Sequence, residues 1–109
     1  MKPMKKKKMK LEVTNAILAF MTNGLAFTAL DICNYVRDQN PNVKARYFDI
    51  SSIVKKSVLN LAQTFSYQYN ASLQTVDSDG SPILAYVYHH MDFDPENYLS
   101  RDQTTLQTL

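Results

Sequence analysis

The chain carries helical and strand periodicity in an order that leaves few folds open to it. Residues 28–61 predict a helix, a short break and a second helix, because apolar side chains recur there every three or four positions. Residues 67–76 and 83–90 instead show strand character, and the turn-forming residues 77–81 separate them. We therefore expect an α+β fold in which helices precede a β-hairpin.

A further helix precedes this pair. Four apolar residues recur at helical spacing and predict its buried side: Val13, Ile17, Phe20 and Met21. Asn23-Gly24 is typical of a helix end, because glycine readily takes the left-handed conformation needed there. Residues 25–27 are apolar and too few for a helix, so they can pair as a third strand.

Capping residues predict the limits of the next two helices. The hydroxyl of Thr28 can accept from an early backbone N–H and Asp31 can reach back, which predicts a helix start. Pro41 predicts the end of that helix, because proline disfavours helical geometry in the residue before it. The third helix is expected over about residues 46–63, with Asp49 as either its cap or a first-turn acid.

The third helix predicts one buried side and one exposed side. Its apolar stripe consists of Ile50, Ile53, Val54, Val58, Leu61 and Phe65. The remaining arc carries Ser51, Ser52, Lys55, Lys56 and Asn60. Across the three helices we expect one core that contains Ile17, Phe20, Leu30, Ile50, Val54, Val58 and Leu61.

Charge is distributed unevenly along the 109 residues. Residues 1–10 hold six lysines and no acid, whereas residues 92–102 hold four acids and one arginine. We expect a disordered basic arm at 1–10, a folded domain at 11–91 and a mobile acidic and polar tail at 92–109. A basic head of this kind indicates binding to a polyanion.

The composition argues against several other classes of protein. The single cysteine, Cys33, offers no disulfide framework and favours a reducing, cytoplasmic setting. No segment approaches the roughly 20 apolar residues of a membrane span, so no membrane partner is expected. His89 and His90 are adjacent on a strand and point to opposite faces, and two glycines are too few for a phosphate-binding loop. We expect no catalytic residues, metal or cofactor, and hence no enzyme.

Residues 13–90 resemble a winged helix-turn-helix domain, as found in small bacterial and phage proteins. The resemblance is carried by Phe27-Thr28-Ala29-Leu30-Asp31-Ile32, by Asn42-Val43-Lys44-Ala45-Arg46 leading to Asp49-Ile50, and by Ala85-Tyr86-Val87-Tyr88-His89. It implies that the third helix reads the major groove of DNA and that the hairpin, or wing, touches the backbone or the minor groove.

The sequence and this resemblance together predict a small transcriptional regulator that binds double-stranded DNA, as a homodimer because one module contacts few bases. The expected DNA-binding residues are Lys44, Arg46, Ser51, Ser52, Lys55, Lys56 and Asn60. The basic arm would add contacts to phosphates through Lys5, Lys6, Lys7, Lys8 and Lys10.

One feature favours a different partner. The expected hairpin tip carries Asp77 and Asp79 and no cation, so phosphates would repel it. The return strand at 83–90 is also largely apolar on both faces. The alternative is a winged helix that binds a protein through its outer sheet face, as an inhibitor or adaptor of host machinery.

Overall fold

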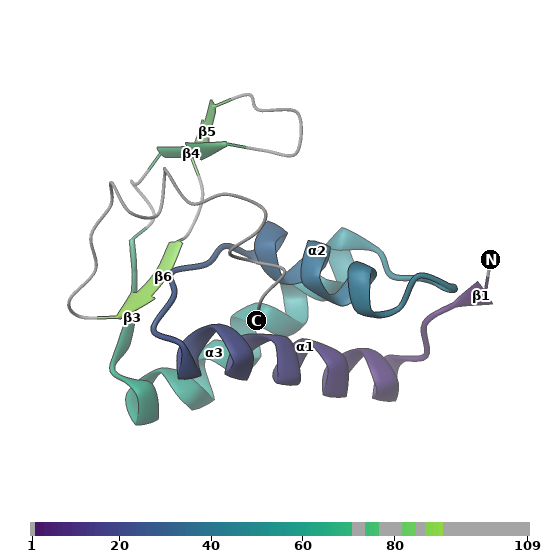
Figure 1. Ribbon diagram of the computed structural model, residues 1–109, viewed down its shortest axis with the longest axis horizontal. Coiled ribbons are helices and arrows are strands. Elements are labelled where there is room, and N and C mark those ends of the chain that lie inside the picture. The colour runs from purple at the N-terminus through teal and green to yellow at the C-terminus, as the bar shows by residue number, and fades with distance from the viewer. Residues whose placement is uncertain (1, 71–73, 77–81, 85–86, 91–109) are drawn as a thin grey trace.

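The computed structural model describes residues 2–70, 74–76, 82–84 and 87–90, which form an α+β arrangement (Figure 1). Its three helices are α1 (Lys6–Thr22), α2 (Ala29–Gln39) and α3 (Tyr47–Phe65). Each helix packs against the other two. A β-ladder lies at one end of the helices and a short strand, β1, lies at the other (Figure 1).

The lysine-rich start is helical rather than disordered. We expected residues 1–10 to be a disordered arm, but α1 already begins at Lys6. Met9 is 5% exposed and lies one helical turn before Val13, so it extends the buried stripe of α1 through the lysines. Met4 is also buried, at 7% exposure. The expectation of a disordered arm is therefore wrong for the described residues.

The first helix ends as its sequence predicts. Gly24 has a φ of +66°, and its backbone N–H donates to the carbonyl oxygen of Met21 at 3.1 Å. The N–H of Leu25 donates to the carbonyl oxygen of Phe20 at 3.0 Å. These two bonds satisfy carbonyl groups that the end of a helix would otherwise leave unpaired.

The starts of α2 and α3 differ in their capping. At α2 the Oγ1 of Thr28 accepts from the N–H of Asp31 at 3.2 Å, and Oδ2 of Asp31 accepts from the N–H of Thr28 at 2.9 Å. This reciprocal capping box confirms the predicted helix start. At α3 the capping position belongs to Arg46, which makes no side-chain cap, and Asp49 is the first-turn acid.

The predicted strand pair is present within the described residues. Strand β3 (Tyr67–Asn70) pairs antiparallel with β6 (Val87–His90), and β4 (Gln74–Val76) pairs antiparallel with β5 (Pro82–Leu84). The expected turn at 77–81 and the tail at 92–109 lie outside the described residues. The segment 25–27 contributes one bridging residue to the ladder, because Phe27 and Tyr88 exchange backbone hydrogen bonds of 2.9 and 2.8 Å.

A second, parallel pair was not predicted. Strand β1 (Lys2–Pro3) lies beside β2 (Val43–Lys44), with Lys2 opposite Val43 and Pro3 opposite Lys44. The N–H of Met4 then donates to the carbonyl oxygen of Lys44 at 2.9 Å. The start of the chain is thereby attached to the connection between α2 and α3.

The core contains most of the residues expected there. The expected residues that are buried in one cluster are Ile17, Phe20, Ile50, Val54 and Val58. Leu61 is partly buried against that cluster. Leu30 is only half-buried and lies outside it, so its assignment to the core is wrong. Helix α2 instead buries Ile32, Cys33 and Val36, and Leu30 lies about 200° around the helix from Ile32.

Aromatic side chains attach the ladder to the helices. The ring of Phe27 lies 5.3 Å from that of Tyr88, 5.9 Å from that of Tyr67 and 5.5 Å from that of Phe20, measured between centroids. The hydroxyl of Tyr67 donates to the carbonyl oxygen of Leu25 at 2.8 Å. This cluster fixes the position of β3 and β6 beside the end of α3.

Candidate functional site

The exposed side of α3 combines positive, polar and apolar groups. We define the α3 outer face as Phe48, Ser52, Lys55, Lys56 and Leu59, all of which are exposed. At about 100° per residue, these positions fall within about 100° of arc. The opposite side of the same helix buries Ile50, Val54 and Val58.

Two residues that we expected on this face lie at its edges. Ser51 and Asn60 are nine positions apart, which places them about half a turn from each other on the helix. Ser51 is half-buried toward the core, whereas Asn60 is exposed beside Lys56. The structure therefore groups Ser52, Lys55 and Lys56, and separates Ser51 from Asn60.

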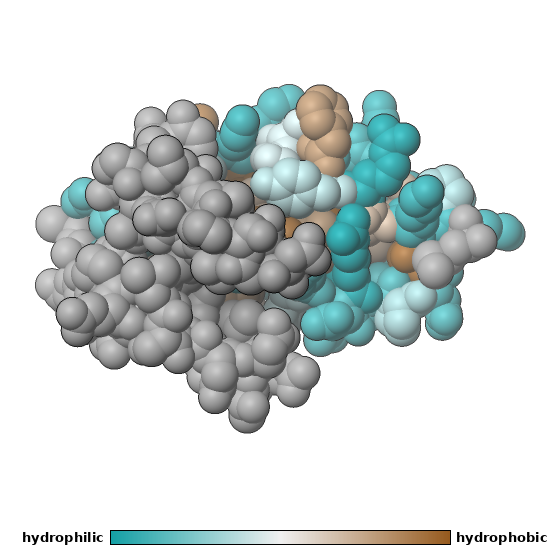
Figure 2. All heavy atoms as spheres, turned by 90° about the horizontal axis from the view of Figure 1, so that it is seen from above, coloured by the Kyte–Doolittle hydropathy of each residue, from teal (hydrophilic) through white to brown (hydrophobic). Residues whose placement is uncertain are grey.

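Two apolar side chains on this face are unusually exposed. Phe48 is 74% and Leu59 is 75% exposed. They are eleven residues apart, which is about three helical turns, so they share one stripe. Seen from above, the described surface is mostly hydrophilic, with apolar side chains that stand out from it (Figure 2).

A groove borders the C-terminal half of α3. It has a volume of about 550 Å³ and lies between α3 and the paired strands β3 and β6. Among the described residues, its lining consists of Lys55, Val58, Leu59, Ala62, Tyr67, Gln68 and Tyr88. Most of these contribute apolar surface, and Lys55 places a charge at its margin.

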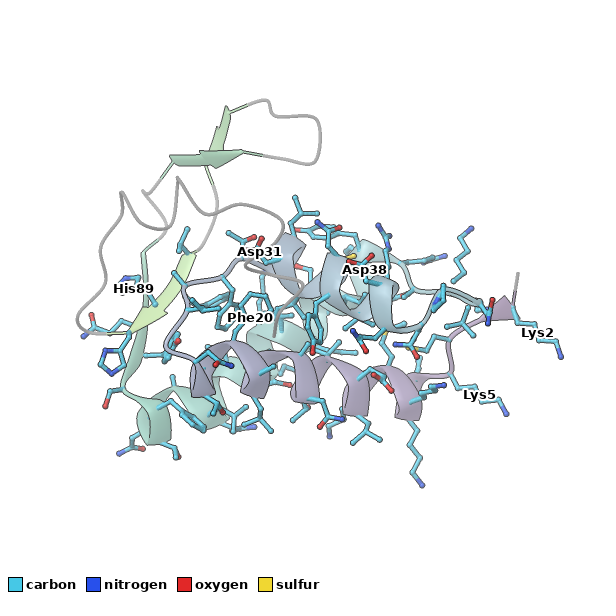
Figure 3. The ribbon with its side chains drawn as sticks, in the orientation of Figure 1. Lys2, Lys5, Phe20, Asp31, Asp38 and His89 are labelled. Carbon is cyan, nitrogen blue, oxygen red and sulfur yellow. The ribbon has the colours of Figure 1, made fainter. Side chains whose placement is uncertain are left out.

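Basic side chains gather at the opposite end of the molecule. We define the basic end as Lys2, Lys5, Arg37, Lys44 and Arg46. Lys2 and Lys5 extend away from the helices at this end (Figure 3), and the strand pair β1–β2 places Lys2 opposite Val43, the residue before Lys44. Arg46 lies 3.4 Å from Asp49, between Nε and Oδ2, in an exposed pair of a kind that contributes little to stability.

Arg37 belongs to this end although we did not single it out from the sequence. Its Nε donates to the carbonyl oxygen of Ala45 at 2.9 Å, and this hydrogen bond links the last turn of α2 to the connection before α3. Together with Lys44 and Arg46 it lines a depression of about 390 Å³. The sequence signal was its place in the last turn before Pro41, but nothing local indicates which way its side chain turns.

The start of α1 adds uncompensated positive charge. Its first turn follows Lys5 and contains Lys6, Lys7 and Lys8 but no acid. The N-terminus of a helix carries partial positive charge, so each lysine there lowers the stability of the helix. The typical cost of such an exposed charge is about 0.3–1 kcal/mol. Among the described residues, no carboxylate lies within ion-pair distance of these lysines. The resulting positive field is open to an external anion.

The groups capable of chemistry lie elsewhere. Cys33 is buried, and burial raises the pKa of its thiol while the positive charge of Arg37 partly lowers it. His90 lies edge-on to the ring of Tyr67, with 6.0 Å between centroids. Within the described ranges, no three His, Cys, Asp or Glu side chains gather closely enough to hold a metal ion.

Within the described part of the chain, none of the three helices is both long and apolar enough to cross a bilayer. No protein-family model, curated protein or solved structure matches this chain. The features of the described residues that can indicate a function are the α3 outer face, the groove beside it and the basic end.

Proposed function

We propose that this chain is a DNA-binding protein of the winged helix-turn-helix class, with α3 as the helix that enters the major groove. The order of elements supports the proposal. α1 is followed by the bridging residue Phe27, then by α2 and α3 across a short connection, and then by the antiparallel pair β3–β6. In this proposal the strands that follow α3 form the wing.

The observation that carries the proposal is the α3 outer face. An α-helix fits the major groove, where polar side chains can reach base edges and apolar ones can contact the thymine methyl group. Ser52 and Phe48 supply these two kinds of group on one stripe, and Lys55 and Lys56 flank them with positive charge. The only acid in α3 is Asp49, which pairs with Arg46 at the edge of that arc.

The basic end supplies the remaining phosphate contacts in this proposal. Lys44 and Arg46 immediately precede α3, so they would lie beside the backbone where the helix enters the groove. The lysines at the start of α1 would add attraction that carries no sequence information. A regulator of this size would act as a homodimer, because a single module reads too few base pairs.

The test is a titration of mixed-sequence double-stranded DNA at several salt concentrations. With about four phosphate contacts from Lys44, Arg46, Lys55 and Lys56, the logarithm of affinity should fall against the logarithm of salt with a slope of about −3.6, or about twice that for a dimer. Changing Lys55 and Lys56 together to alanine should flatten the slope by about 2 per module.

Two controls separate charge from fold and from specificity. Changing Lys55 and Lys56 together to arginine retains both charges and should leave the slope near its original value. Ser52→Ala should alter the preference among sequences while it leaves the slope unchanged. A slope that is unaffected by the double alanine change would contradict the role of α3.

A second candidate is a winged helix that binds a protein. Phe48 and Leu59 favour it, because large apolar side chains about three-quarters exposed on one stripe are typical of a contact surface. The apolar groove beside Leu59 adds to that surface. In this case the double alanine change would leave DNA binding as it was. Weak DNA binding would then be lost only when Lys5, Lys6, Lys7, Lys8 and Lys10 are changed to glutamine.

A further inference from the structure

Three basic residues from separate segments line the depression at the basic end. Arg37 belongs to α2, Lys44 belongs to β2, and Arg46 is the residue before α3. Residues 37 and 46 are nine positions apart along the chain, and the hydrogen bond from Arg37 to Ala45 brings them to one depression. Like charges placed together repel each other, so this arrangement would be relieved by a bound anion.

The N-terminal strand holds one side of this depression in place. β1 pairs with β2, and the N–H of Met4 donates to the carbonyl oxygen of Lys44. The Met4 side chain is buried in the same core cluster as Ala45. The first residues of the chain thus act as a strap across the connection that carries Lys44, with Met4 as its anchor.

We propose that Arg37, Lys44 and Arg46 form one binding site for the DNA phosphate backbone and that the β1 strap keeps this site assembled. The inference rests on the proposed function and adds Arg37 and the strap to the contacts assigned there to Lys44 and Arg46. Guanidinium groups suit it because they can donate two parallel hydrogen bonds to phosphate oxygens. The depression lies directly beside the start of α3, so a phosphate held there would fix how α3 enters the groove.

The carboxylate of Asp49 is part of the balance at this site. It lies 3.4 Å from Arg46 and would be displaced from, or share, that guanidinium when a phosphate binds. Three cations against one carboxylate leave a net charge of about +2, which is enough to neutralise the two phosphate diesters counted for Lys44 and Arg46. The site therefore remains attractive to a phosphate with the pair to Asp49 intact.

Single substitutions test the three cations. Arg37→Gln, Lys44→Gln and Arg46→Gln should each flatten the salt slope for double-stranded DNA by up to about 0.9. Lys7→Gln is the matched control, because it removes the same charge from an exposed position on α1 about 160° around the helix from Met9. Its effect on the slope should be less than half as large. Equal effects at Lys7 and at the three cations would overturn the site and leave only a diffuse positive field.

Two methionine variants test the strap without altering any charge. Met4→Ser should release β1 and weaken DNA binding roughly 2- to 10-fold at an unchanged slope, because the side chains of the site must then be ordered on binding. Met9→Ser removes a side chain of the same type and similar burial from α1 and leaves β1 intact. Both are measured well below their melting temperatures. Equal affinities for the two variants would overturn the strap.

The outcomes also separate this inference from the proposed function. In one outcome, the double change of Lys55 and Lys56 to alanine flattens the salt slope, while Arg37→Gln changes that slope no more than Lys7→Gln does. This result would support α3 as the helix that reads DNA and would overturn the phosphate site. Wild-type protein that shows no salt-dependent binding to double-stranded DNA would overturn both.

Discussion

Three apolar-to-alanine changes within α3 should rank by burial. Val54→Ala removes two carbon atoms from a side chain that is 0% exposed. At about 0.8 kcal/mol per buried methylene this gives about 1.6 kcal/mol, and the cavity left behind brings the total loss of unfolding free energy to about 2–3 kcal/mol. Leu61 is only partly buried, so Leu61→Ala should cost about 1–2 kcal/mol, below the range expected for a fully buried site.

Leu59→Ala is the internal control, because Leu59 lies in the same helix and is 75% exposed. It should change the unfolding free energy by less than about 0.5 kcal/mol. Urea unfolding followed by helical circular dichroism measures all three variants, and equal m values show that the comparison is like for like. A cost at Leu59 equal to that at Val54 would refute the assignment of the buried side of α3.

Three further predictions concern other groups. Thr28→Ala removes the α2 cap and should cost about 1–2 kcal/mol in urea unfolding. Thr14→Ala should cost clearly less, because Thr14 is a half-buried mid-helix residue of α1 whose hydroxyl only donates to the carbonyl oxygen of Lys10 in the same helix. Asp49→Asn should lower the unfolding free energy by about 0.3–1 kcal/mol, because it removes the first-turn acid of α3. The same change should tighten DNA binding, because it frees Arg46 from its ion pair, and weaker binding would contradict this prediction. Burial raises the pKa of the Cys33 thiol in the folded protein above that in the unfolded chain. The contribution of this group to stability should therefore be complete below the pKa of the unfolded thiol and should be lost as pH rises through the folded pKa. Unfolding curves measured across the alkaline range should show this loss of stability with rising pH.

Local signals account for the elements that the sequence predicted well. The signals at helix ends act over a few residues, so both partners of each interaction are close in the sequence. Examples are Thr28 with Asp31 at the start of α2, and Asn23 with Gly24 at the end of α1. The same holds for the apolar stripe of α3, whose period places Ile50, Val54 and Val58 on one side. Helix limits and most of the core followed from these patterns.

The N-terminal strap could not be predicted in this way. Lys2 and Val43 are about forty positions apart, and two-residue strands have no period to detect. Met4 and Met9 stand among lysines, where composition indicates a solvated segment, yet tertiary contacts bury both. Leu30 was wrongly assigned to the core because an apolar residue near a helix start can fit the helical spacing and still be only half-buried.

Helix α3 connects two surfaces of different chemistry, and this separates the two candidate functions in space. Its first residue borders the cationic depression at the basic end, whereas its last two turns border the apolar groove beside β3 and β6. Lys56 lies on the outer face between them, and Lys55 lies at the margin of the groove. A DNA reader needs the half of α3 nearest the basic end, and a protein partner would cover the half nearest the groove. Substitutions at Arg46 and at Leu59 therefore probe different surfaces of one helix.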